Sequence, residues 1–131
     1  MNKILLDTNA YVNLCTGDGK VMEALSAAET VFVSAVTLGE LYAGFEKTEK
    51  GHGKKHEFEN FLSNPTVKII DITKETAGIY GDLIRTLRKA GTPVPINDVW
   101  IAANAIETGS VIVTYDRHFL KIAGLRIWDQ L

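Results

Sequence analysis

Short apolar runs alternate along the chain with longer segments in which apolar residues recur at helical spacing. The first of these runs stops abruptly at Asp7 and has no polar face, which is typical of a strand buried on both sides of a parallel sheet. We predict strands at residues 3–6, 31–33, 67–70 and 111–114, and an edge strand at 125–127. We predict helices at residues 10–14, 18–28, 35–47, 58–62, 73–90 and 97–107. This alternation predicts an α/β fold with a central parallel sheet of four to five strands, right-handed crossovers and helices on both faces, in three α/β/α layers.

Several helix boundaries have local signals. Ser34 is a suitable N-cap for the helix that follows it, and Gly91 and Gly109 suit the ends of the last two helices. Two prolines stiffen the segment after Gly91. Asn97 is then expected to cap the next helix, which places Asp98 in its first turn.

Length and composition limit the class of protein. With 131 residues, 46% of them hydrophobic, the chain is expected to form one domain over residues 1–131. The sequence shows neither a leader pattern nor an apolar run of the roughly 18 residues that a membrane span requires, so we expect a cytoplasmic protein. The single cysteine, Cys15, has no base partner nearby in sequence and is expected to be buried and structural. The net charge of −2 argues against a general polyanion binder, unless the basic residues gather on one face.

Basic residues are concentrated in two stretches of the chain. The first is expected to be a loop around two glycines and contains Lys47, Lys50, Lys54 and Lys55. The second ends the predicted helix 73–90 and contains Arg85, Arg88 and Lys89. Solvent exposure or the helix dipole explains such residues, and contact with phosphates is the other interpretation. His52 and His56 have the spacing of a helical metal pair, but the neighbouring lysines would repel a cation, so we expect them to face solvent.

Four acidic residues occupy positions that the predicted topology can bring together. Asp7 and Asp116 follow two buried strands, Asp98 lies in the first turn of a helix, and Glu40 is an isolated charge in an apolar segment. Each position alone has an ordinary explanation, such as the helix dipole for Asp98 or solvent exposure for Glu40. Together the four can reach the carboxyl edge of the sheet, where open α/β proteins bind their ligands.

Carboxylates that share a pocket require compensation for their charge. At an effective dielectric of about 20, each close pair repels by roughly several kcal/mol, so the group needs cations or must take up protons. Oxygen ligands alone favour Mg²⁺ or Mn²⁺ over zinc, and the sequence has no cysteine and histidine set with zinc spacing. Such cations activate water and stabilise a leaving oxygen during displacement at phosphorus. The residues therefore predict phosphodiester hydrolysis or a related reaction.

The same residues resemble the PIN domains, and among them the VapC-type toxin ribonucleases of toxin–antitoxin pairs. Four stretches carry the resemblance, and their order and spacing extend it over nearly the whole chain: residues 6–9, 34–41, 97–103 and 114–119. The resemblance implies that Asp7, Glu40, Asp98 and Asp116 are the acidic quartet of the family, with Asp7 and Asp98 as direct metal ligands. It further implies that three neighbouring residues orient carboxylates or a phosphate, namely Thr8, Asn9 and Thr114.

The implied activity is that of a Mg²⁺-dependent endoribonuclease, with Mn²⁺ as a substitute. Such an enzyme cuts single-stranded or looped RNA, for example a tRNA, and leaves a 5′-phosphate and a 3′-hydroxyl. The resemblance also implies a homodimer and a cognate VapB-like antitoxin that occupies the groove and extends an arginine toward the acids. In that setting the candidate contacts to RNA phosphates are Lys47, Lys50, Lys54, Lys55, Arg85 and Arg88.

Three alternatives differ in the chemistry they require. A haloacid-dehalogenase-like phosphatase needs a second acid two residues after Asp7, where this chain has Asn9. A receiver domain needs an acidic pair ahead of its phosphorylated aspartate and a lysine after a late strand, and neither pattern is found. A catalytically silent PIN-like module that binds RNA or a protein remains open, although four mutually repelling acids give such a module no advantage. Stabilisation by a divalent metal that disappears in Asp7→Asn would distinguish the enzyme from this module.

Overall fold

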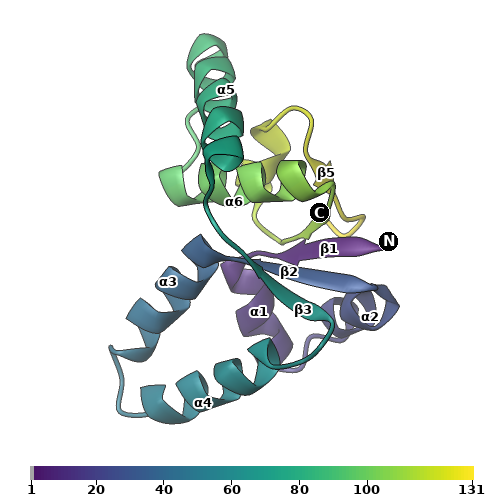
Figure 1. Ribbon diagram of the computed structural model, residues 1–131, viewed down its shortest axis with the longest axis vertical. Helices are drawn as coiled ribbons and strands as arrows, with labels where there is room; N and C mark the ends of the chain where they lie inside the picture. The colour runs from purple at the N-terminus through teal and green to yellow at the C-terminus, as the bar shows by residue number, and fades with distance from the viewer. Residues whose placement is uncertain (1) are drawn as a thin grey trace.

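Five parallel strands form a single sheet in the computed structural model, which describes residues 2–131 (Figure 1). The strands are β1 (Lys3–Leu6), β2 (Thr30–Ser34), β3 (Val67–Ile70), β4 (Val111–Val113) and β5 (Arg126–Ile127). Their order is β3-β2-β1-β4-β5, and each neighbouring pair is parallel. The predicted α/β fold with a parallel sheet is confirmed. Because β1 is the central strand, Asp7, which follows it directly, lies in the middle of the carboxyl edge.

In the part of the chain that the structure describes, six α-helices and one 3₁₀ helix cover the two faces of the sheet. They are α1 (Thr8–Cys15), α2 (Gly19–Ala27), α3 (Ala35–Phe45), α4 (Gly51–Leu62), α5 (Lys74–Ala90), α6 (Ile96–Thr108) and the 3₁₀ helix η1 (Arg117–Lys121). Figure 1 shows α1 to α4 below the sheet and α5 and α6 above it. Within residues 2–131, no helix combines the length and apolar character needed to cross a membrane.

Alternate residues of the central strand belong to different halves of the core. Ile4 and Leu6 pack in the cluster that includes residues of α1 to α4, whereas Leu5 packs in the cluster formed with α5, α6 and η1. All three side chains are fully buried. Their period of two, with apolar residues at every position, is the pattern of a strand covered on both faces.

The expected helix ends at three positions are confirmed. Ser34 caps α3, because its hydroxyl oxygen accepts a hydrogen bond from the backbone N–H of Val36 at 3.1 Å. Gly91 and Gly109 end α5 and α6 with φ angles of +65° and +66°. Only glycine adopts this left-handed conformation without strain, which is why these positions stop the helices.

The loop predicted around Lys47 to His56 is wrong, because α4 begins at Gly51 and carries both histidines and two of the lysines. Packing outweighs the glycines, which disfavour a helix by about 1 kcal/mol each. Phe58 is fully buried, and its ring lies 4.9 Å from that of Tyr11 and 6.0 Å from that of Phe45, measured between centroids. Gly51 also lets the start of α4 lie close to the end of α3, since a Cβ at Gly51 would lie 1.6 Å from the carbonyl oxygen of Phe45.

Two further local predictions are wrong. Cys15 is exposed and not buried, because it is the last residue of α1 and lines an open groove between helices. Pro95, not Asn97, is the N-cap of α6, and the helix starts at Ile96. The Asn97 side chain instead donates from Nδ2 to Glu40 Oε2 at 3.4 Å. Asp98 still lies in the first turn, as expected.

Candidate active site

Asp7 is the most buried of the four acids, with 4% of its surface exposed. Its backbone is extended and its carboxylate caps α1, where Oδ1 accepts a hydrogen bond from the N–H of Ala10 at 2.7 Å. The hydroxyl of Thr114 donates to the other oxygen, Oδ2. Both carboxylate oxygens are therefore fixed, one by the first turn of α1 and the other by the residue that follows β4.

Thr114 joins Asp7 to the loop that carries Asp116. Its Oγ1, which donates to Asp7, accepts from the backbone N–H of Asp116 at 2.9 Å. The indole N–H of Trp128, near the end of the chain, donates to the Thr114 carbonyl oxygen. These contacts are buried or half-buried, so the position of Asp116 relative to Asp7 is set by the hydrogen bonds of one threonine.

Glu40 reaches the same edge from α3. Its Oε1 accepts a hydrogen bond from the Thr8 hydroxyl at 2.6 Å, and its Oε2 accepts the bond from Asn97 described above. Thr8 thus holds the Glu40 carboxylate by a hydrogen bond, and its supporting role in the site stays a prediction. Asn9 is exposed, and its side chain forms no recorded hydrogen bond to the four acids in the part of the chain that the structure describes.

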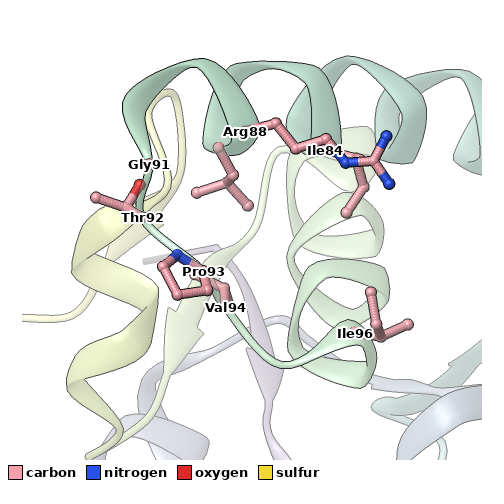
Figure 2. A pocket seen from close by; sticks show the side chains of 8 residues that line it. Ile84, Arg88, Gly91, Thr92, Pro93, Val94 and Ile96 are labelled. Carbon is pink, nitrogen blue, oxygen red and sulfur yellow. The ribbon is translucent and has the colours of Figure 1, made fainter.

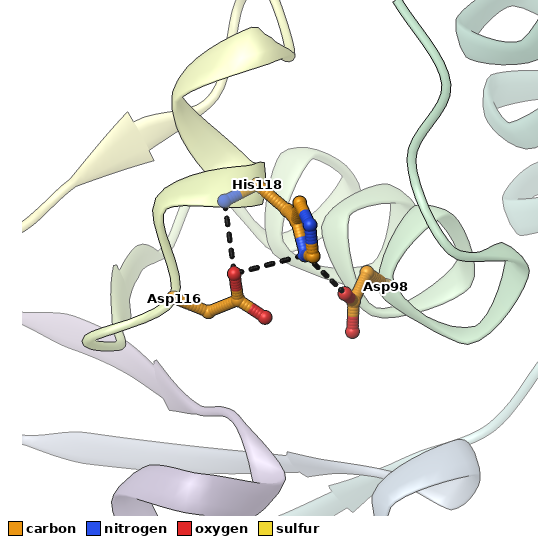
Figure 3. A group of neighbouring side chains, drawn as sticks. All are labelled: Asp98, Asp116 and His118. Carbon is orange, nitrogen blue, oxygen red and sulfur yellow. Dashed lines mark hydrogen bonds and ion pairs between the residues drawn. The ribbon is translucent and has the colours of Figure 1, made fainter.

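Asp98 and Asp116 lie on either side of a histidine that the sequence analysis did not single out. Figure 3 shows the His118 ring between the two carboxylates, with Nδ1 lying 3.0 Å from Asp116 Oδ1 and 3.8 Å from Asp98 Oδ2. The backbone N–H of His118 also donates to Asp116 Oδ1 at 2.9 Å. His118 comes two residues after Asp116, where the chain turns back on itself. Its position directly behind a strand-end acid is the local signal that could have identified it.

The convergence of the acids changes their acidity. Burial raises the pKa of Asp7 from 3.8 to about 6; the hydrogen bonds from Thr114 and Ala10 oppose the rise, and the charges of Asp116 and Glu40 add to it. Burial also raises the pKa of Asp98 to about 6, helped by the charges of Asp116, Glu40 and Asp7 and opposed by His118. The raised pKa of each of these two acids therefore reflects its burial first and the charges of the neighbouring acids second.

A model of the PIN domain family matches residues 4–125. The chain belongs to the PIN-domain family. It is 34% identical to the ribonuclease VapC2 of Haemophilus influenzae, with 96% of each chain covered. It is 31% identical to the tRNA(fMet)-specific endonuclease VapC of Salmonella typhimurium, with 98% of each covered.

Solved structures of toxin–antitoxin complexes have the same fold as this PIN domain. The DNA-bound VapBC complex of Salmonella typhimurium includes a chain with a TM-score of 0.86 and 31% identity, covering 98% of both chains. VapBC2 of Rickettsia felis, bound to a DNA fragment from its promoter, includes one with a TM-score of 0.85 and 27% identity, covering 96% of this chain and 97% of the other. These similarities confirm the resemblance to VapC-type PIN domains.

The predicted phosphate contacts occupy different places around the PIN-domain acids. Lys54 lines a groove of about 460 Å³ that also contains Thr8 and Glu40. Lys55, one residue further along α4, places its ammonium 5.6 Å from the centroid of the Tyr42 ring. Lys47 and Lys50 are exposed between α3 and α4.

The arginines lie on the other side of the sheet, on α5. Arg85 is exposed and pairs with Asp82 at 3.5 Å. Arg88 lines a second groove, of about 340 Å³, between the end of α5 and the start of α6 (Figure 2). That groove ends at Ile96, two residues before Asp98. Of the six basic residues, Lys54 is therefore the one that shares a groove with a member of the acidic quartet.

Proposed function

We propose that this PIN domain is a metal-dependent endoribonuclease, the toxin of a toxin–antitoxin pair, and that it hydrolyses phosphodiester bonds in RNA with Mg²⁺, for which Mn²⁺ can substitute. The observation that supports it best is the convergence of Asp7, Glu40, Asp98 and Asp116 at the carboxyl edge, two of them with a pKa of about 6. Neighbouring carboxylates with raised pKa values are typical of catalytic sites.

The donor set fits a hard divalent cation. Four carboxylates supply oxygen ligands, the type that Mg²⁺ and Mn²⁺ prefer. Asp98, Asp116 and His118 each offer one ligand atom, and these atoms lie within 4.8 Å of one another. When bound, Mg²⁺ would supply an activated water and charge neutralisation at the phosphate. We propose Asp7, Asp98, Asp116 and Glu40 as the residues that hold it.

The contribution of the chain itself is preorganisation. Asp7 is held by Ala10 and Thr114, so its carboxylate does not need to reorient when a substrate arrives. Thr8 and Asn97 hold Glu40 in the same way. The half-buried position of Asp98 and Asp116 limits the water around these two carboxylates.

The substrate and partners proposed here rest on the relatives. The Salmonella typhimurium relative is named for cleavage of tRNA(fMet), and we propose a structured RNA such as a tRNA as substrate. The similar structures are complexes of VapC with VapB, so we propose a VapB-like antitoxin as partner. We further propose a homodimer, which the resemblance to VapC-type PIN domains implies, and a cytoplasmic location, because the RNA substrate is found in the cytoplasm.

Cleavage of total RNA by the purified protein tests the proposed function. We expect discrete fragments with 5′-phosphate and 3′-hydroxyl ends in the presence of Mg²⁺ or Mn²⁺, and no fragments in EDTA. End mapping of the products would identify the RNA. Binding of RNA without cleavage under either metal would instead support the silent PIN-like module.

Replacing Lys54 by glutamine is expected to weaken RNA binding and reduce its salt dependence. One lost phosphate contact on a single strand lowers the slope of log K against log salt by about 0.7 in magnitude. Lys3→Gln is the matched control, because it removes the same charge from the exposed start of β1, at the edge of the sheet opposite the acids. Fluorescence anisotropy at several salt concentrations, in EDTA to prevent cleavage, measures both. Equal slopes for Lys54→Gln and the parent would remove Lys54 from the RNA-binding surface.

A further inference from the structure

A fully buried amide, that of Asn104 on α6, lies where α3, α5 and α6 meet. Its Oδ1 accepts a hydrogen bond from the Ser34 hydroxyl at 2.7 Å. Its Nδ2 donates to Glu107 Oε1 at 3.2 Å and to the carbonyl oxygen of Asp71 at 3.4 Å. Glu107 Oε1 also accepts from the Thr76 hydroxyl at 2.7 Å, which connects the network to the start of α5.

The chemistry of the partners fixes the direction of every bond in this network. Ser34 Oγ accepts the backbone N–H of Val36, so its own proton is free to point at Asn104. Glu107 and the Asp71 carbonyl are acceptors, so they face the NH₂ of Asn104 and not its oxygen. The amide therefore has one orientation, and the network holds one arrangement of the helices.

Stability alone does not explain a polar residue at this position. Hydrogen bonds only offset the desolvation of a buried amide, and an apolar side chain of similar size would pack there without that penalty. Buried polar groups of this kind are instead suited to fixing a single geometry among packed elements.

Two side-chain hydrogen bonds join α6 to α3 and its N-cap, and the acids lie at one end of this pair of helices. Ser34 bonds Asn104 in the interior, and Glu40 bonds Asn97 near the surface. Glu40 follows Ser34 by six residues and Asp98 precedes Asn104 by six, which corresponds to about 9 Å along each helix. The helical segments thus run antiparallel between the two contacts, and the interior contact anchors the pair of segments whose other ends carry Glu40 and Asp98.

We propose that Asn104 is a positioning residue which, through Ser34, sets the separation of Glu40 and Asp98 and thereby the affinity of the acidic site for a divalent metal. It rests on the proposed function, since it assumes that these acids hold a metal. Asn104 does not touch the acids; it acts by fixing the helices that carry them.

Binding of Mn²⁺ to Asn104→Asp tests the inference without reliance on activity. This variant keeps the shape of the side chain and the acceptor for Ser34, but it places an oxygen opposite Glu107 Oε1, where the parent has a donor. The resulting repulsion is expected to raise the Mn²⁺ dissociation constant roughly tenfold to a hundredfold, as for other residues that orient ligands. Adding Glu107→Gln returns a donor to this contact, and we expect the double variant to bind Mn²⁺ within about threefold of the parent. Loss of the electron paramagnetic resonance signal of free Mn²⁺ measures the bound fraction.

Ser110→Ala serves as the control for a buried polar deletion on the same side of the molecule. Ser110 is 1% exposed and bonds Thr108 at the far end of α6, so its loss is expected to lower the melting temperature but leave Mn²⁺ affinity unchanged. Ser34→Ala removes the hydrogen bond between Ser34 and Asn104 by deleting its donor. Its Mn²⁺ affinity tests the proposal if Asn104→Asp does not fold. If the parent binds no Mn²⁺, the proposed metal role of the acids is wrong. If the parent binds Mn²⁺ and both Asn104→Asp and Ser34→Ala bind it equally well, the positioning role of Asn104 is wrong.

Discussion

Asp98→Asn is expected to abolish RNA cleavage, with a fall in kcat/KM well beyond the ~10–100-fold that is typical when a residue merely supporting a metal ligand is lost. Asparagine has the same shape and is compatible with the first turn of α6, so the helix is retained. What is lost is one negative charge facing Asp116 and His118, and with it one of the proposed metal ligands. The rate of cleavage of an end-labelled RNA, under Mg²⁺ and with the same enzyme concentration, measures the effect.

Asp82→Asn is the matched control for this change. Asp82 is also an aspartate on a helix, but it is exposed on α5 and pairs with Arg85, a contact worth only a few tenths of a kcal/mol. We expect parental cleavage rates and an unchanged far-ultraviolet circular dichroism spectrum. Activity of Asp98→Asn within about tenfold of the parent would contradict a direct role for this carboxylate.

Asp7→Asn is expected to stabilise the metal-free protein at neutral pH. One pKa unit corresponds to about 1.4 kcal/mol, so the rise of the Asp7 pKa from 3.8 to about 6 disfavours the ionised folded state by about 3 kcal/mol. Asparagine still caps α1 but leaves the Thr114 hydroxyl proton without its acceptor, which costs about 1 kcal/mol. The net gain in the free energy of unfolding should be about 1–2 kcal/mol in EDTA, measured by urea denaturation.

The stability that Asp7→Asn gains over the parent is expected to increase with pH. The folded state holds the Asp7 proton more tightly than the unfolded state, so the parent loses stability as the pH rises from about 4 to about 6. Above about pH 6 the penalty is complete, and below about pH 4 it disappears. The advantage of Asp7→Asn over the parent should therefore be present at pH 8 and absent at pH 4. A variant less stable than the parent at pH 8 in EDTA would contradict this account.

Two further measurements separate the effect of the Asp7 charge on stability from the effect of helix capping. They are stabilisation by Mg²⁺ and the substitution of Asp18, a second aspartate that caps a helix. Mg²⁺ at 100 times its dissociation constant should stabilise the parent by about 2.7 kcal/mol and should stabilise Asp7→Asn far less. Asp18 also caps a helix, but hydrogen bonds from the N–H of Val21 and the hydroxyl of Tyr115 lower its pKa. Asp18→Asn is therefore expected to give no gain in stability at pH 8.

The order of elements and the edge at which the acids gather followed from local patterns. An uninterrupted apolar run such as residues 4–6 is typical of a strand covered on both faces, and it therefore indicated the parallel sheet that the structure contains. Asp7 comes directly after such a strand and Asp98 lies in the first turn of a helix, so the topology alone placed them near one edge. The helix ends at Gly91 and Gly109 could also be predicted from the sequence, because each depends on the backbone conformation of a single glycine.

Features that depend on contacts between distant residues could not be predicted in this way. Residues 51–57 form part of a helix because Phe58 packs against rings from α1 and α3, although their own composition favours a loop. The exposure of Cys15 depends on how far α3 and α4 lie from the end of α1, which periodicity does not report.

The sequence by itself determined the fold class of this PIN domain and the places of Asp7 and Asp116 after buried strands, because strand burial and strand ends are properties of short segments. Only the tertiary structure decided how those acids are held. The Thr114 hydroxyl reaches Asp7 across 107 residues of sequence, Ser34 reaches Asn104 across 70, and Asn97 reaches Glu40 across 57. Such bonds leave no local pattern, since each donor and acceptor is an ordinary polar residue until the sheet and its crossovers bring the two together.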